Sequence, residues 1–533
     1  MKRVHRLRSS MIFLILLNLI GAAFAFLDLQ ANGQTSFSLK QCRSLAAKAP
    51  TLLRSSIDDT SVGGTPDTPE LDSDGWSPQS WRNKVDKSKK PIFEDEKKLE
   101  EAEKTLASYS PLVFAGECRN LHEALAKASM GNGFVLLGGE AESFEGFQVD
   151  KVRDTFRILL QMALILTYGG SMPVVKIGRM AGSFATLPKS EVEEKGGAAL
   201  PSFHGDLING EAFTPEARRG DPGRLVQAYH QSAQTLNLLR AFARGGYADI
   251  HRLHAWNLDF LEQADDEEGG PGARYRALAE KVEDALLFLE AVGVDTRAAP
   301  FTQAAFYTGH AVAPEALPYE AALCREDSTT GRRYACSAHL LWVPDREMRQ
   351  GGGPVVEYLR GVANPVAVKV GPEVTPEAFV RVLDALNPRN TPGRVTAITR
   401  MGAAALRERL PALVRAAQKD GRSVVWVCDP MHANARAING LRSVAFEDLR
   451  AELRAFFDVH RRMGSHPGGA ALMLTGEDVT ECVGGSVNEV VDNSENHAAG
   501  PYADPRLNPD QALELAFLIA ARVRTAKGRR PLW

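Results

Sequence analysis

The hydrophobic pattern of the chain is a regular alternation of short apolar runs with longer amphipathic segments. The clearest apolar runs end in glycine or in a charged residue, and they lie at 134–139, 173–177, 365–369, 395–400 and 424–429. Runs that stay apolar at successive positions are typical of parallel strands that are buried on both faces. They therefore predict the strands of a parallel sheet.

The amphipathic segments predict helices between and around these strands. The main ones lie at 149–166, 224–243, 275–291, 376–386, 446–462 and 509–524. Strand and helix alternate over about 400 residues, which predicts an α/β fold with a single (β/α)8 TIM barrel, an N-terminal extension and extra helices. A doubly wound open sheet is the alternative, but no GxGxxG motif follows the first predicted strand.

The N-terminal part of the chain follows a different pattern. A basic start precedes an apolar run at 11–26, which contains Ala23-Phe24-Ala25 and predicts a signal peptide at residues 1–25. A membrane anchor is the alternative, but the run is short for a span of about 20 residues. We expect the signal peptide to be removed and the mature chain to have no stable membrane insertion.

Residues 26–75 predict a transit-like segment and a linker. The first part is basic and rich in serine and threonine with Asp28 as its only early acid, and the second is rich in Gly, Pro, Thr and Asp. This order resembles the two-part presequences of algae whose plastid lies inside extra membranes. We expect a plastid (chloroplast) location, with the secretory pathway as the alternative, and a folded domain at 76–533.

Composition and charge exclude several classes of function. The chain has 63 basic and 66 acidic residues and a formal net charge of −3, so no global field favours nucleic acid as a partner. Its six cysteines are scattered without CxxC spacing, which argues against a zinc knuckle or a disulfide-rich scaffold. We expect buried, reduced thiols.

Three cations follow predicted strands. Arg179, Lys369 and Arg400 each lie at the C-terminal end of an apolar run, where the active sites of barrels are built. Each residue alone fits a structural ion pair, but together they predict a site for a small polyanion such as a phosphate compound. Loops that follow strands supply candidates for a second phosphate, namely Lys189, Ser190 and Arg346.

A histidine and an aspartate supply candidate metal ligands. His432 follows Asp429 by three residues at the end of a predicted strand, and Asp504 opens the run Asp504-Pro505-Arg506-Leu507-Asn508. A lone histidine is often structural. The strand-end position and the neighbouring cations nevertheless favour a divalent metal that polarises a carbonyl group.

Ordered sequence blocks from about Trp76 to about Arg524 closely resemble class II (plant-type) 3-deoxy-D-arabino-heptulosonate 7-phosphate (DAHP) synthases. The blocks include Trp76-Ser77-Pro78, Arg179-Met180-Ala181-Gly182, Arg400-Met401-Gly402, Asp429-Pro430-Met431-His432, His466-Pro467-Gly468-Gly469, Val479-Thr480-Glu481-Cys482 and Asp504-Pro505-Arg506-Leu507-Asn508. The resemblance implies a (β/α)8 barrel that condenses phosphoenolpyruvate with erythrose 4-phosphate, the first step of the shikimate pathway to chorismate and aromatic amino acids.

The resemblance also assigns roles to residues. It implies that Arg179, Lys369 and Arg400 bind phosphoenolpyruvate, that Lys369 and His432 are catalytic, and that His432 and Asp504 are metal ligands. The implied cofactor is a divalent metal, Mn²⁺ in first place with Mg²⁺ or Co²⁺ as alternatives. We expect a homo-oligomer, because related barrels commonly self-associate.

The chain departs from the family at two metal ligands. Its stretch 138–144 is one residue shorter than the family block and lacks the ligand cysteine, and Met473 stands where the family has a ligand glutamate. Glu140 is the candidate third ligand and Glu477 a more remote one. Two alternatives therefore stay open: an impaired barrel that binds phosphoenolpyruvate or regulates a true synthase, and a related condensation with another aldehyde.

The substrate motifs are altered as well. Thr186-Leu187-Pro188-Lys189-Ser190 replaces a Lys-Pro-Arg-Ser block of the family, which is expected to contact the sugar phosphate. The block around Arg346 has one extra residue, so the arginine that corresponds to the family's own stays open.

Overall fold

A computed structural model describes residues 75–86, 91–188, 190–245, 249–262, 271–291, 306–486, 489–497 and 502–528. Residues from Leu71 to Trp533 belong to one compact unit. The predicted signal peptide, the transit-like segment and Lys189 lie outside the described residues.

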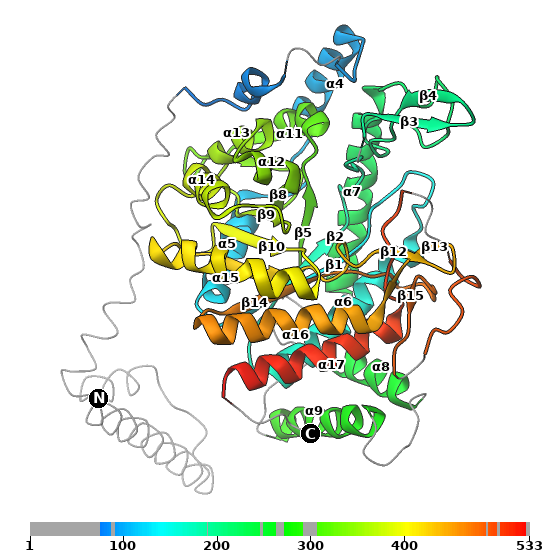
Figure 1. Ribbon diagram of the computed structural model, residues 1–533, viewed down its shortest axis with the longest axis vertical. Coiled ribbons are helices and arrows are strands. Elements are labelled where there is room, and N and C mark those ends of the chain that lie inside the picture. Colours follow the sequence, from blue (N-terminus) through cyan, green and yellow to red (C-terminus); the bar gives the residue numbers. More distant parts are fainter. Residues whose placement is uncertain are drawn as a thin grey trace, which may run out of the picture. The chain divides into compact units, whose positions relative to one another are not determined.

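Eight parallel strands form a closed barrel in the order β1-β14-β11-β10-β9-β8-β5-β2 (Figure 1). The predicted (β/α)8 fold is therefore confirmed, and each of the five predicted strands is present. The strands are β1 (Phe134–Gly139), β2 (Val174–Arg179), β5 (Phe306–Ala311), β8 (Leu340–Val343), β9 (Val366–Val370), β10 (Val395–Thr399), β11 (Val425–Cys428) and β14 (Pro467–Met473).

Helices surround this barrel, and the six predicted ones are all present. They are α6 (Val149–Gly170), α7 (Gly223–Arg244), α9 (Pro271–Ala291), α14 (Pro376–Leu386), α16 (Phe446–Met463) and α17 (Pro509–Ala526). Further helices are η2 (Ser80–Lys84), α4 (Glu96–Ser108), α5 (Ala115–Ser129), α8 (Ile250–Glu262), η3 (Pro314–Ala316), α11 (Leu317–Ala322), α12 (Asp345–Gln350), α13 (Pro354–Gly361) and α15 (Ala403–Lys419).

Three small sheets lie outside the barrel. They are formed by β3 (Val192–Lys195) with β4 (Ala198–Pro201), by β6 (Cys324–Glu326) with β7 (Arg333–Ala335), and by β12 (Arg436–Ile438), β13 (Leu441–Ala445) and β15 (Cys482–Val483). The third sheet is relevant to the site because β13 contributes Arg442.

Alternate residues of the strands fill the barrel interior, as the pleat of a strand requires. They form one buried cluster together with Leu121, Leu125 and Ala128 of α5, which closes the N-terminal end. Burying one leucine side chain contributes about 2 kcal/mol. The inward residues include Val135, Leu137, Val175, Ile177, Tyr307, Leu340, Trp342, Ala367, Ile398, Val425, Val427 and Ala471.

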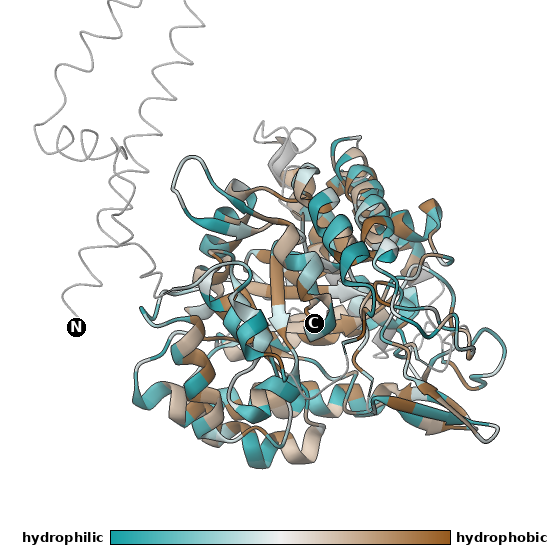
Figure 2. Cartoon of the chain, turned by 90° about the horizontal axis from the view of Figure 1, so that it is seen from above, coloured by the Kyte–Doolittle hydropathy of each residue, from teal (hydrophilic) through white to brown (hydrophobic). Residues whose placement is uncertain are grey.

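The outer faces of the strands pack against the surrounding helices. Figure 2 shows hydrophobic strands in the middle of the molecule and helices with many hydrophilic residues around them. Among the residues that the structure describes, no helix is long and apolar enough to cross a membrane. With α5 at one end, the open end of the barrel is the end at which its strands finish.

Candidate active site at the barrel mouth

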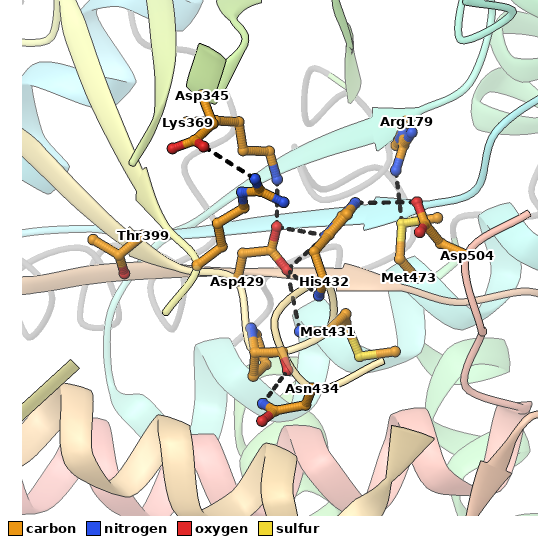
Figure 3. A network of polar contacts seen from close by, with 12 residues as sticks. Arg179, Asp345, Lys369, Thr399, Asp429, Met431, His432, Asn434, Met473 and Asp504 are labelled. Carbon is orange, nitrogen blue, oxygen red and sulfur yellow. Dashed lines mark hydrogen bonds and ion pairs between the residues drawn. The ribbon is translucent and has the colours of Figure 1, made fainter. Parts of the chain in front are cut away.

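Several strands lead to a charged residue at the next inward-facing position. Counting two residues onward from the buried interior cluster leads to Arg179, Lys369, Arg400, Asp429 and Met473. Contacts run in a chain from Lys369 through Asp429 and His432 to Asp504, and Arg179 contacts Met473 beside this chain (Figure 3). The strand-end pattern thus gathers charged groups where barrel enzymes carry their chemistry.

Lys369 and Asp429 form a buried ion pair at the centre of this mouth. The Lys369 ammonium group donates a short hydrogen bond to Asp429. Burial lowers the pKa of Lys369, and the nearby guanidinium groups of Arg179 and Arg400 lower it further, against the effect of Asp429. Burial alone would raise the pKa of Asp429, but His432 and Lys369 hold it well below its usual value.

His432 lies between two carboxylates. Its Nδ1 is 2.7 Å from an oxygen of Asp429, and its Nε2 is 3.2 Å from an oxygen of Asp504. Despite the opposing effect of burial, these carboxylates raise the pKa of His432. Asp504 is also 2.9 Å from the guanidinium of Arg442, and its pKa is lowered by His432, Arg179 and Arg442 although burial opposes the shift.

Arg179 points to the position of the family's glutamate ligand. Its Nη1 is 2.8 Å from the sulfur of the buried Met473, and its Nε donates to Ser183 over 3.0 Å. Gly139 makes this packing possible: its φ is +127°, and a Cβ there would lie 2.7 Å from the Arg179 carbonyl oxygen. The strand ends of β1 and β2 therefore leave no room for a side chain at Gly139.

Arg400 completes the cation set. Its Nη2 lies 3.2 Å from Asp345, a carboxylate that also contacts Arg349 at 3.3 Å and accepts the Gly371 amide at 2.7 Å. The structure thus brings Arg179, Lys369 and Arg400 to one mouth, since each lies two residues beyond an inward-facing strand residue. In agreement with this placement, Arg179 and Arg400 both lower the pKa of Lys369.

The candidates for a second phosphate are more scattered. Arg346 lies exposed on α12, and Ser190 is exposed in the loop before β3, where its hydroxyl accepts the Val192 amide at 3.3 Å. Lys189 is outside the described residues. Their assignment to the sugar phosphate remains a prediction.

Glu452 of α16 was not predicted as a site residue. Its buried carboxyl group accepts the amides of Met401 at 3.0 Å and Gly402 at 2.9 Å, and the side-chain amide of Asn434 at 2.7 Å. It therefore joins the loops that follow β10 and β11, which carry Arg400 and His432. Burial, with a further contribution from Asp429, raises the pKa of Glu452 to about 7.

We expect Glu452→Gln to change how stability depends on pH. The pKa of this carboxyl rises from 4.5 in the unfolded chain to about 7 in the folded chain, so the folded chain binds the proton more tightly. The protonated group therefore adds up to about 3 kcal/mol to the free energy of unfolding at low pH, and this addition is lost as the pH rises from 4.5 to about 7. Urea unfolding between pH 4.5 and 7 should show a shallower decline in the variant. Glu447→Gln, at an exposed acid of the same helix, should keep the wild-type slope, and equal slopes in all three proteins would contradict the assignment.

Arg506, inside the run that begins with Asp504, is the hub of a second buried network. Its guanidinium binds Glu481 at 2.6 and 2.9 Å, Glu140 at 2.6 Å and Glu477 at 3.2 Å. Lys151 is 3.2 Å from both Glu140 and Glu477. The carboxylate of Glu140, the candidate third metal ligand, is thus held by two cations.

The same run ends in a helix cap. Asn508 accepts the Gln511 amide at 2.9 Å, and the Gln511 side chain accepts the Asn508 amide at 3.4 Å, which starts α17 with Pro509 in its first turn. Together with Arg506, this capping box fixes the segment that carries Asp504.

A cavity opens beside Arg179. Its empty volume is about 490 Å³, open to solvent on one side, between the loop after β1, the start of α6 and the end of β2. Glu140, Gln148, Lys151 and Arg179 are among its polar lining residues.

The residues present do not fit a divalent-metal site. Of the four ligand positions in the family, His432 and Asp504 remain and are in contact, while the cysteine is absent and Met473 offers a thioether, a poor ligand for Mg²⁺ or Mn²⁺. In the described ranges, no three His, Cys, Asp or Glu side chains are placed to hold a metal ion. Glu140 is not brought together with His432 and Asp504 as such a set.

Comparisons with known proteins agree with this architecture. Residues 76–520 match the model of the class-II DAHP synthetase family. A phospho-2-dehydro-3-deoxyheptonate aldolase of Streptomyces coelicolor is 42% identical over 447 residues, which cover 84% of this chain and 97% of the relative. Phospho-2-dehydro-3-deoxyheptonate aldolase AroG of Mycolicibacterium smegmatis is 41% identical over 429 residues, 79% of this chain and 89% of the relative. The chain belongs to the class-II DAHP synthetase family.

Proposed function

We propose that this chain is a DAHP synthase, which condenses phosphoenolpyruvate with erythrose 4-phosphate to DAHP and phosphate as the first step of the shikimate pathway. The observation that carries the proposal is the intact cation set of Arg179, Lys369 and Arg400 at the mouth of a family-type barrel. Relatives named phospho-2-dehydro-3-deoxyheptonate aldolase cover most of the chain and support it.

The three cations suit the phosphate and carboxylate of phosphoenolpyruvate. Arginine offers a planar pair of donors to either group, while lysine acts as a compact point charge. Because Arg179 and Arg400 both disfavour the charged form of Lys369, a bound anion relieves their mutual repulsion. Phosphoenolpyruvate would therefore bind with its negative groups toward Lys369 and Arg400.

The reaction then changes the charge and bonding at the aldehyde oxygen and at C2 of phosphoenolpyruvate. C3 of phosphoenolpyruvate forms a bond to the aldehyde carbon of erythrose 4-phosphate, and the aldehyde oxygen gains a proton. Water adds at C2 and gives up one proton, and phosphate then leaves with its bridging oxygen as the C2–O bond breaks, while the C2 hydroxyl loses its proton to form the ketone. His432, whose pKa both Asp429 and Asp504 raise, is the proposed proton donor to the aldehyde oxygen.

The second candidate function is a barrel that binds phosphoenolpyruvate without turnover, or that regulates a true synthase. It is favoured by the replacement of two ligand positions beside an intact anion clamp. A related condensation with another aldehyde is favoured by the altered Thr186–Ser190 block and by the exposure of Arg346. A panel of aldehydes in the same assay separates this possibility from the first.

The cellular location and the oligomeric state of the chain are proposed from its sequence. The composition of residues 1–75 supports a plastid location by way of a two-part presequence, with the secretory pathway as the alternative. We also propose a homo-oligomer. Import of a fluorescent protein fused behind residues 1–75, and the mass of the purified chain in solution, would test these two proposals.

Turnover by the chain from Leu71 to Trp533 tests the function. We expect phosphoenolpyruvate to be consumed and phosphate released only when erythrose 4-phosphate is present. Arg400→Ala should raise the KM for phosphoenolpyruvate by about 10- to 100-fold, since a charge-assisted contact contributes about 1.5–3 kcal/mol. Arg407→Ala, an exposed arginine of α15 that bonds only its own helix backbone in the described structure, should leave KM unchanged.

The outcomes separate the candidates. Binding of phosphoenolpyruvate without any turnover favours the non-catalytic barrel, and turnover only with another aldehyde favours the related condensation. A chain that neither binds nor consumes phosphoenolpyruvate contradicts all three.

A further inference from the structure

The metal-ligand positions of the family are occupied here by groups that bind one another. Met473, at the glutamate position, contacts the Arg179 guanidinium at 2.8 Å. Asp504 faces a second guanidinium, that of Arg442, at 2.9 Å. Two positions that would face a metal cation in a family member therefore face arginines in this chain, and Figure 3 shows the first of these contacts, between Met473 and Arg179.

His432 lies between two carboxylates in this chain. Its Nδ1 lies 2.7 Å from Asp429 and its Nε2 lies 3.2 Å from Asp504. Asp504, the second retained ligand position, is thus held between His432 and Arg442.

The carboxylate of the candidate third ligand is also engaged. Glu140 binds the largely buried guanidinium of Arg506 at 2.6 Å and the Lys151 ammonium at 3.2 Å. Moving it toward His432 would leave Arg506 with fewer partners in a buried position, and removing one partner from a buried pair is costly. Glu140 is therefore a poor replacement for the lost cysteine.

The net charge of the barrel mouth also disfavours a divalent cation. Lys369, Arg179, Arg400 and Arg442 already contribute four positive charges, against the carboxylates of Asp345, Asp429 and Asp504. Family members add a thiolate and a glutamate that offset a dication, whereas this chain has neither at the corresponding positions. A divalent ion would thus meet repulsion that the site does not compensate.

We infer that this pocket works without a divalent metal, and that the guanidinium groups of Arg179 and Arg442 supply the positive charge next to the reacting aldehyde oxygen. The role of that charge rests on the proposed synthase reaction, whereas the absence of a metal does not depend on it. Arg442, which lies on β13 and was not singled out by sequence, is assigned to this role by its contact with Asp504.

The test measures metal binding and turnover separately. The purified chain is treated with chelator, titrated with Mn²⁺, and its bound Mn²⁺ is counted by electron paramagnetic resonance and elemental analysis. We expect well under one Mn²⁺ per chain and the same rate of phosphoenolpyruvate consumption with and without EDTA. One Mn²⁺ per chain, lost in Asp504→Asn, together with turnover that EDTA abolishes, would overturn the inference.

Variants of Arg442 test whether this arginine takes the place of the metal charge. Arg442→Met should lower kcat by about 10- to 100-fold with little change in the KM for phosphoenolpyruvate, as loss of one transition-state charge contact would. Arg442→Lys should recover part of the rate, and added Mn²⁺ should not rescue Arg442→Met. Arg436→Met is the matched control, because Arg436 lies on the adjacent β12 and pairs with Asp448.

A double variant rebuilds a ligand set. Met473→Glu with Arg442→Met returns a carboxylate and frees Asp504, so we expect it to bind Mn²⁺ more tightly than the wild type. Equal Mn²⁺ binding by both proteins would overturn the idea that these two residues exclude the metal. If the wild type binds no metal and shows no turnover under any condition, the metal-free pocket stands and the proposed synthase activity falls.

Discussion

Lys369→Met is expected to lower kcat/KM for phosphoenolpyruvate by at least about 10³-fold, which corresponds to about 4 kcal/mol of transition-state stabilisation. The substitution keeps the length of the side chain but removes the cation that lies between Asp429 and the two arginines of the clamp. It also leaves the buried Asp429 with His432 as its one remaining charged partner among the ion pairs described above. Steady-state kinetics and a direct binding titration with phosphoenolpyruvate measure the effect.

Lys176→Met is the matched control for this experiment. Lys176 is also a buried lysine in a barrel strand, and burial lowers its pKa to about 8, but it precedes the inward-facing Ile177 and points away from the barrel interior. We expect its replacement to leave kcat/KM near the wild-type value. If Lys369→Met keeps both its affinity for phosphoenolpyruvate and its turnover, Lys369 has no part in the anion site.

The sequence was sufficient to predict the barrel and the placement of three cations at its mouth, because both depend on local patterns. The strands at 134–139 and 395–399 are apolar at nearly every position, which is what burial on both faces requires. Since inward residues alternate along such strands, the charged residues Arg179, Lys369 and Arg400 at their ends are directed into the same mouth.

Strands β5, β8 and β14 were not predicted, for identifiable physical reasons. Strand β5 carries two buried polar residues, Thr308 and His310, whose partners His339 and Glu320 come from elsewhere in the chain. Strand β8 has only four residues, and β14 begins with Pro467 followed by two glycines. Polar positions in β5, the shortness of β8 and the proline and glycines at the start of β14 each weaken the local pattern of a buried strand.

The ion-pair partners within the site could not be predicted either. Glu140 and Arg506 are 366 residues apart, and no local pattern indicates that they meet. Glu452 lies within an amphipathic helix, where an acidic residue normally faces solvent. The sequence identified the missing metal ligands, but the arginines that contact the remaining ones became visible only when β13 and the Asp504 segment were placed together.

Arg506→Met is expected to reduce the free energy of unfolding by roughly 3–5 kcal/mol, the usual cost of removing one partner from a buried ion pair. Glu481 is fully buried and receives three hydrogen bonds from the backbone amide and guanidinium of Arg506. Without the arginine, that carboxylate is left with a large desolvation penalty, and the segment that carries Asp504 loses its main anchor. We therefore expect a lower free energy of unfolding, measured with urea, and a lower rate of turnover.

Two comparisons isolate the cause of this loss. Arg436→Met removes an arginine whose side chain is 57% exposed, so it should change the unfolding free energy by less than about 1 kcal/mol. The double variant Arg506→Met with Glu481→Leu removes both buried charges, and it should regain part of the stability, because an apolar pair of similar volume avoids the desolvation penalty. A double variant less stable than Arg506→Met would show that the network stabilises the fold through its hydrogen bonds to the backbone, since the unpaired charge of Glu481 would then not be the source of the loss.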